Sequence, residues 1–221
     1  MKPNLQFLIV LLLFSAPICA ELAPYVGATL QGQACSGNSK GYGPYDYSKR
    51  HLIPAKHLNI VEEYHFTPNV ENLIAGSSSG TPYGDLDYTL RAWPNHHRAL
   101  LSLIRYQLEV IKKIRKDKSI KIPPECYLQR AIHFSPNDPM AYSLYGYYLA
   151  KVGQHKNAEK FYKKALELSP ENSKIEYSYA LLLIDLKRNS EAVEVAKKSY
   201  QHGHPPEGLK NKLKKIGAWK N

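Results

Sequence analysis

The second half of the chain repeats itself with a period of 34 residues. Shifting it by 34 positions superimposes Tyr145 on Tyr179, Gly146 on Ala180, Leu149 on Leu183, Ala158 on Ala192, Ala131 on Ala165 and Pro136 on Pro170. A fixed period of this length is typical of stacked repeats, in which each unit is one supersecondary element. Apolar residues within the period recur at intervals of three and four, which is helical spacing. The pattern therefore predicts an all-α solenoid of helix hairpins.

The best copy of the period, Pro139 to Asn172, resembles the tetratricopeptide repeat. It carries the residues typical of that family: Tyr142 where Trp is usual, Gly146 in the first helix, Gly153 in the turn, Ala158, Tyr162 and Ala165 in the second helix, and Pro170 at the end. The resemblance implies two antiparallel helices per unit. It also implies a ribbon of stacked units whose inner surface is lined by the first helices.

Further copies flank the best one. The copy at residues 173–206 is weaker, with Lys187 in the turn and Ser199 where Ala is usual. A divergent copy at 95–138 carries an insertion of about 8 residues, since Pro94 before it and Pro136 near its end are 42 positions apart rather than 34. Its helices are expected at about 95–116 and from the Pro123-Pro124 entry to near Phe134. With a lone helix at 85–93, residues 85–204 and a cap supply about six to eight helices.

Residues 21–84 differ from the repeats. Glycines punctuate this segment, and three tyrosines lie close together in the stretch Gly41 to Tyr47. Only Thr67 to Ala75, followed by Gly76, predicts a short helix. We expect the rest to be an irregular extension packed on the first helices. Together with residues 85–100, it resembles a group of small exported bacterial repeat proteins, a resemblance that implies no activity.

The first twenty residues have the pattern of a secretory signal peptide. One lysine, Lys2, precedes the apolar run from Phe7 to Phe14, and Ala20 is a small residue at the expected cleavage point. The run is shorter than the 20 or so residues that span a bilayer. The pattern predicts a periplasmic or secreted product cleaved after Ala20. Two alternatives are a retained anchor and a lipoprotein that carries its lipid on Cys19.

Two cysteines, Cys35 and Cys126, remain after removal of such a signal. An even pair in an oxidising compartment favours one disulfide. Closing a loop of about 90 residues contributes roughly 4 to 5 kcal/mol by the chain-entropy estimate. The alternative is a buried helical Cys126 and a free loop thiol at Cys35.

The first helices of the repeats supply the candidate peptide-binding groove. Tyrosine buries area at low entropic cost, and Lys or Arg can meet carboxylates of an extended peptide or protein partner. From the family's pattern the candidates are Arg98, Arg105, Ser143, Tyr147, Lys151, Lys174, Tyr177 and Leu181. The alternative is that Tyr147 and Tyr177 complete the core. Family members that clamp a C-terminal carboxylate have Asn where Tyr147 stands, so that mode is not expected.

Most of the formal net charge of +11 comes from two basic clusters, which hold Lys112, Lys113, Arg115, Lys116, Lys118 and Lys121, and then Lys212, Lys214 and Lys215. They suggest contact with anionic lipid, lipopolysaccharide or an acidic partner, with solubility as the plainer alternative. Nucleic acid is not expected for an exported protein. In residues 205–221, apolar side chains at helical spacing predict a basic capping helix, with Leu209, Leu213, Ile216 and Trp219 on its buried face.

Histidine is the main prompt for a metal or catalytic site. His96 and His97 are adjacent and would point about 100° apart on a helix, while His202 and His204 lack an acid at ligand spacing. His51, His57, Glu63 and His65 match no metal template, and the chain contains no phosphate loop, nucleophile elbow or dinucleotide fingerprint. We therefore expect a non-enzyme without metal, cofactor or small-molecule substrate. A metal-binding or enzymatic role of residues 21–84 is the last alternative.

Overall fold

The computed structural model describes residues 23–112, 120–203 and 205–219 of the 221-residue chain. These residues form ten α-helices and one short 3-10 helix. Within them, the nearest thing to a strand is a single antiparallel bridge between Ala28 and Ala34. The predicted all-α class is confirmed. None of the helices in the described ranges is long and apolar enough to cross a membrane.

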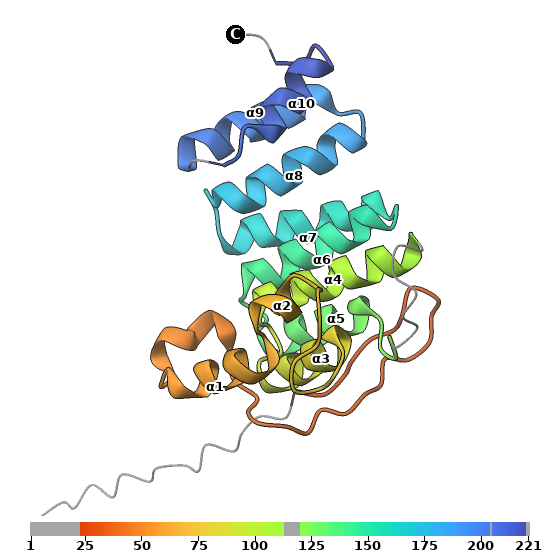
Figure 1. Ribbon diagram of the computed structural model, residues 1–221. Coiled ribbons are helices and arrows are strands. Elements are labelled where there is room, and N and C mark those ends of the chain that lie inside the picture. Colours follow the sequence, from red (N-terminus) through yellow and green to blue (C-terminus); the bar gives the residue numbers. More distant parts are fainter. Residues whose placement is uncertain (1–22, 113–119, 204, 220–221) are drawn as a thin grey trace, which may run out of the picture.

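Three helix hairpins stack along the length of the molecule (Figure 1). They pair α4 (His97–Ile111) with α5 (Pro124–Phe134), α6 (Pro139–Lys151) with α7 (His155–Leu168), and α8 (Ser173–Asp185) with α9 (Asn189–His202). The two helices of the divergent copy are therefore present, although α4 ends five residues earlier than predicted. The packing of α4 on α6 and of α6 on α8 places the first helices side by side.

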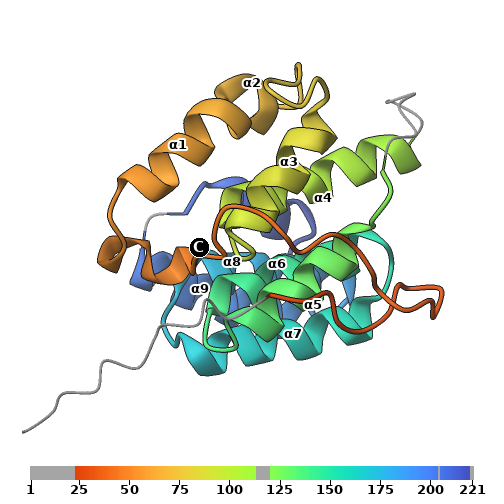
Figure 2. The same ribbon diagram turned by 90° about the horizontal axis from the view of Figure 1, so that it is seen from below.

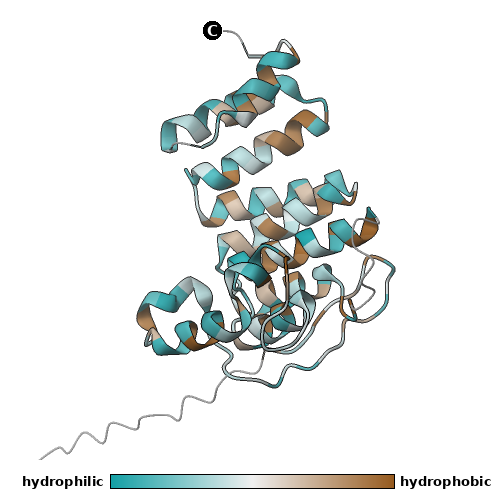
Figure 3. Ribbon diagram, viewed as in Figure 1, coloured by the Kyte–Doolittle hydropathy of each residue, from teal (hydrophilic) through white to brown (hydrophobic). Residues whose placement is uncertain are grey.

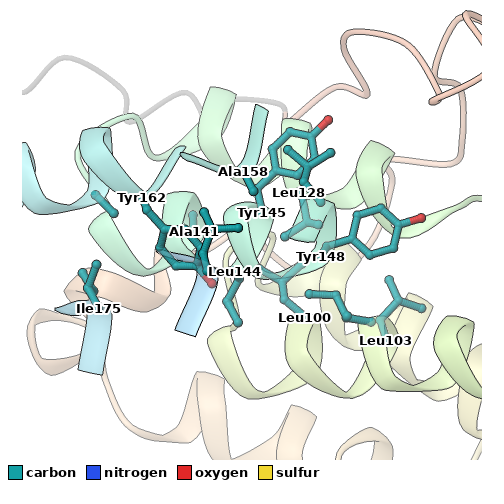
Figure 4. Close-up of a cluster of buried hydrophobic side chains, with 14 of the residues drawn as sticks. Leu100, Leu103, Leu128, Ala141, Leu144, Tyr145, Tyr148, Ala158, Tyr162 and Ile175 are labelled. Carbon is teal, nitrogen blue, oxygen red and sulfur yellow. The ribbon is translucent and has the colours of Figure 1, made fainter. Parts of the chain in front are cut away.

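Small residues let the helices of a hairpin approach closely. Ala158 and Ala165 of α7 are fully buried, and a Cβ added to Gly146 of α6 would lie 3.0 Å from Cδ2 of Tyr162. A larger residue at Gly146 would push α6 away from α7 and leave voids. Figure 4 shows leucine and tyrosine side chains of α4, α5 and α6 meeting in the core beside this contact.

The hydrophobic residues of α8 gather in its second half, whereas α10 is mostly hydrophilic (Figure 3). Helix α10 (Gly208–Lys215) packs on α8 and α9 at the end of the stack and buries Leu209 and Leu213. Ile216 was predicted to lie on the buried face of this helix. Instead, α10 ends one residue before it, and Ile216 is 43% exposed. Trp219 follows the helix and meets the ring of Tyr200 edge-on.

The N-terminal extension contains more helix than predicted. Before the repeats, the chain forms a 3-10 helix η1 (Tyr47–Leu52), then α1 (Lys56–His65), α2 (Pro68–Glu71) and α3 (Pro82–Ala92). Neither η1 nor α1 was predicted, α2 is several residues shorter than predicted, and α3 begins three residues earlier than predicted. Helix α1 was hard to recognise because it buries only Val61 and begins without a side-chain cap. Figure 2 shows α1, α2 and α3 as a layer beside α4.

A second, smaller core joins this layer together. Trp93, which follows α3, is fully buried against Tyr47, Val61 and Ala92. The Trp93 indole N–H donates to the carbonyl of His57, 3.3 Å away. This core attaches η1 and α1 to the end of α3, so the extension is a packed part of the molecule.

Residues 23–46 run as a strap beside α3 and α5 (Figure 2). A disulfide links Cys35 in the strap to Cys126 in α5, with the two Cα atoms 5.4 Å apart, below the limit of about 7 Å for such a bond. Buried Arg130 donates to the carbonyls of Ala23 and Leu90, and Glu125 accepts from the amide of Leu30. Residues of α5 therefore hold the strap both covalently and through hydrogen bonds.

The turns inside the last two hairpins offer a matched test of backbone strain. Gly153 and Lys187 are 34 positions apart, and both have positive φ, at 82° and 63°. A side chain in this conformation is disfavoured, and nothing lies within 4 Å of a Cβ added to Gly153. We expect Lys187→Gly to raise the free energy of unfolding by about 0.5 to 1 kcal/mol, and Gly153→Lys to lower it by a similar amount. Urea unfolding would measure both, and two changes of the same sign would contradict this account.

Candidate functional site

The candidate groove residues lie on the adjacent first helices α4, α6 and α8. We call this surface the first-helix face and define it by six of the predicted residues, namely Arg105, Tyr147, Lys151, Lys174, Tyr177 and Leu181. All six side chains are exposed or partly exposed. The other two predicted groove residues have different surroundings.

Ser143 is not available to a ligand. Its residue is 5% exposed, because the packing of α6 against neighbouring helices covers it. Arg98 is about half exposed, but its guanidinium is bound within the molecule to Glu71 of α2 and Glu62 of α1. Hydrogen bonding to Glu71 raises the pKa of Arg98 and lowers that of Glu71. Arg98 therefore joins the N-terminal layer to α4 rather than offering a free cation to a partner.

The remaining groove cations differ from Arg98 in their surroundings. Within the described residues, Arg105, Lys151 and Lys174 form no ion pair with a carboxylate. The Lys151 ammonium lies 5.4 Å from the ring centroid of Tyr147. Burial raises the pKa of Tyr147, and the positive charge of Arg105 opposes this rise. The face thus combines aromatic rings with cations that form no ion pair with a described carboxylate.

A pocket lies at the α8 end of the first-helix face. It has a volume of about 400 Å³ and is lined by Ser173, Lys174, Tyr177, Ser178, Gly203, Pro205 and Pro206. Two of these, Lys174 and Tyr177, were predicted groove residues. The proline wall was not predicted, because it depends on how the chain folds back after α9. A Cβ on Gly203 would lie 2.8 Å from the side chain of Ser173, so the returning chain contacts α8 closely.

Four of the described histidines each pair with one carboxylate. His65 lies 2.8 Å from Asp85, His96 3.0 Å from Glu62, His97 2.7 Å from Asp138 and His202 2.9 Å from Glu176. Burial lowers the pKa of His96, against the opposing effect of Glu62. No group of three or more His, Cys, Asp or Glu side chains in the described ranges is arranged to hold a metal ion. Three of the four pairs instead fasten the N-terminal layer and the start of α4: His65 with Asp85, His96 with Glu62, and His97 with Asp138.

The two basic clusters are only partly described. Lys112 and Lys121 are exposed, whereas Lys113, Arg115, Lys116 and Lys118 lie outside the described residues, as does His204. In α10, Lys212 pairs with Asp185 at 3.0 Å. Lys214 and Lys215 are exposed and form no ion pair with a described residue. Lys212 is therefore less available to an anionic partner than the sequence of the cluster indicates.

Comparison with known proteins agrees with this architecture. A family model described as tetratricopeptide repeat matches residues 62–202, which include all three hairpins, α3 and the end of α1. A search of curated proteins returned no match. Because the family model covers more than half of the 221 residues, the chain belongs to the tetratricopeptide repeat family.

Proposed function

We propose that this chain is an exported scaffold that binds an extended segment of a partner protein along the first-helix face. Repeats of this family support a role in protein–protein interaction. The observation that carries the proposal is the run of Tyr147, Tyr177 and Leu181 across adjacent helices, beside cations that no described carboxylate neutralises. Partly exposed tyrosines are effective contact residues because a rigid ring buries area at low entropic cost.

The experiment is capture of a partner from envelope extract on the immobilised protein. We expect Tyr147→Ala combined with Tyr177→Ala to weaken binding of the captured protein at least tenfold, since tyrosine hot spots contribute about 2 kcal/mol or more. Tyr64→Ala is the matched control, because Tyr64 is a half-exposed tyrosine on α1, away from the face. Equal recovery by the double variant and the control would reject the first-helix face.

Export and an envelope location are part of this proposal. The signal-like pattern of the first twenty residues supports them, and so does the bond between Cys35 and Cys126. Disulfides form and persist in oxidising compartments and are rare in the cytosol. Detection of the protein in a periplasmic or culture fraction, with a mature N-terminus at Glu21, would support the location. A full-length cytosolic product would reject it.

A second candidate is binding to an anionic envelope surface through lysines at the C-terminal end. The observation that favours it is the exposed pair Lys214 and Lys215, which meets no described carboxylate. We expect sedimentation with vesicles of anionic lipid at low salt, with loss of binding as salt screens the charges. Lys214→Glu with Lys215→Glu should abolish the effect. Binding that does not change with salt would exclude this mode.

A further inference from the structure

One wall of the pocket at the α8 end of the first-helix face is apolar. Pro205 and Pro206 form part of its wall and carry no backbone N–H group. The carbonyl of Pro206 already accepts a hydrogen bond from the Tyr200 hydroxyl at 2.9 Å. This wall therefore offers an apolar surface, and an apolar ligand group buried against it would bind most favourably.

Of the pocket's two serines, Ser178 is engaged within its own helix. Ser178 donates its hydroxyl to the carbonyl of Lys174 at 3.0 Å, and the Ser173 hydroxyl lies 3.5 Å from that of Ser199. The one charged group among the described lining residues is the Lys174 ammonium, which pairs with no described carboxylate. One cation beside an apolar pocket favours an apolar group with a carboxylate next to it.

The chain that leads into α10 lies against α8 beside this pocket. Gly203 lies against Ser173, and a Cβ added to Gly208, the first residue of α10, would be 3.2 Å from the Tyr177 hydroxyl. The returning chain thus closes the surface beyond α8. The volume of about 400 Å³ lies within the range of small-ligand pockets and is ample for one large side chain.

We infer that the partner segment is acidic and anchors one large apolar side chain in the pocket that α8 forms with Gly203, Pro205 and Pro206. This inference rests on the proposed function and specifies its ligand. Carboxylates of the segment would meet Lys174 at the rim, and then Lys151 and Arg105 along the face. The free cations and the closed apolar end together select this chemistry over a basic or purely polar segment.

The test is a selection of random peptides displayed on phage against the immobilised full-length mature protein. We expect the enriched peptides to share Asp or Glu residues around one Phe, Leu, Ile or Trp. Replacing that residue by Ser in a synthetic copy should weaken binding about tenfold to a hundredfold. Enriched peptides without this pattern would overturn the inference and leave the proposed function standing. No enrichment at all would count against both.

Variants locate the binding site of the selected peptide. Ser178→Trp should fill the pocket and abolish binding, whereas Lys198→Trp places the same ring on the exposed surface of α9, outside the pocket, and should retain binding. Lys174→Glu should weaken binding at least tenfold, and the control Lys198→Glu changes an exposed lysine of α9 that pairs with no described carboxylate. Circular dichroism would verify that each variant is folded. Equal binding by Ser178→Trp and Lys198→Trp would show that the anchor lies elsewhere.

Discussion

Removing the disulfide between Cys35 and Cys126 is expected to lower the free energy of unfolding by about 4 to 5 kcal/mol. The bond closes a loop with a sequence separation of 91 residues, so it greatly restricts the unfolded chain. Small domains are stable by only about 5 to 15 kcal/mol, so the loss is a large part of the total. Urea unfolding of the Cys35→Ser/Cys126→Ser variant, followed by circular dichroism, would measure it.

Reductant provides the internal control for this prediction. Adding it should move the unfolding midpoint of the native protein toward that of the double variant and leave the variant unchanged. Glu125 and Arg130 still hold the strap by hydrogen bonds after reduction, so we expect the repeats to remain helical without denaturant. A loss below about 1 kcal/mol would mean that the strap contributes little restriction.

Trp93→Ala is expected to cost about 3 to 5 kcal/mol. The indole is fully buried at the centre of the small core, and its ring centroid lies 5.0 Å from that of Tyr45. Truncation leaves a cavity between α1 and the end of α3 and removes the hydrogen bond to the carbonyl of His57. Urea unfolding monitored at 222 nm would give the change.

Two substitutions bracket the result. Trp93→Phe keeps an aromatic ring and should cost less than Trp93→Ala. Trp219→Phe alters the only other tryptophan, which is partly exposed beside the cap, and should cost least. If Trp93→Ala proved no more costly than Trp219→Phe, the N-terminal layer would not be coupled to the stability of the repeats.

The hairpins could be predicted because their signals are local. Gly146, Ala158 and Gly153 fix the helix contact and the turn of one unit, and the same places recur 34 residues later. The N-terminal layer lacked such signals, because its contacts join distant residues. Glu62, for example, meets His96 and Arg98 across more than 30 positions.

The placement of the candidate residues was predictable to the extent that it follows the repeat. Tyr147 and Tyr177 are partly exposed on adjacent first helices, as the family's pattern indicated. Ser143 is buried rather than open to a ligand, since its exposure depends on how closely α6 meets its neighbours. Arg98 looked available because its carboxylate partners belong to helices that the sequence did not reveal. The pocket needed the path of the chain after Gly203, which no local pattern encodes.

Both ends of the hairpin stack are covered, by α3 and the strap at one end and by α10 at the other. Helices in contact lie about 8 to 10 Å apart, so α4 and α8 are separated by roughly 20 Å across α6. An extended chain advances about 3.3 Å per residue, and some six residues therefore cross the whole face. Because α3 and the strap cover one end of the stack and α10 the other, the proposed function implies a bound segment of about this length.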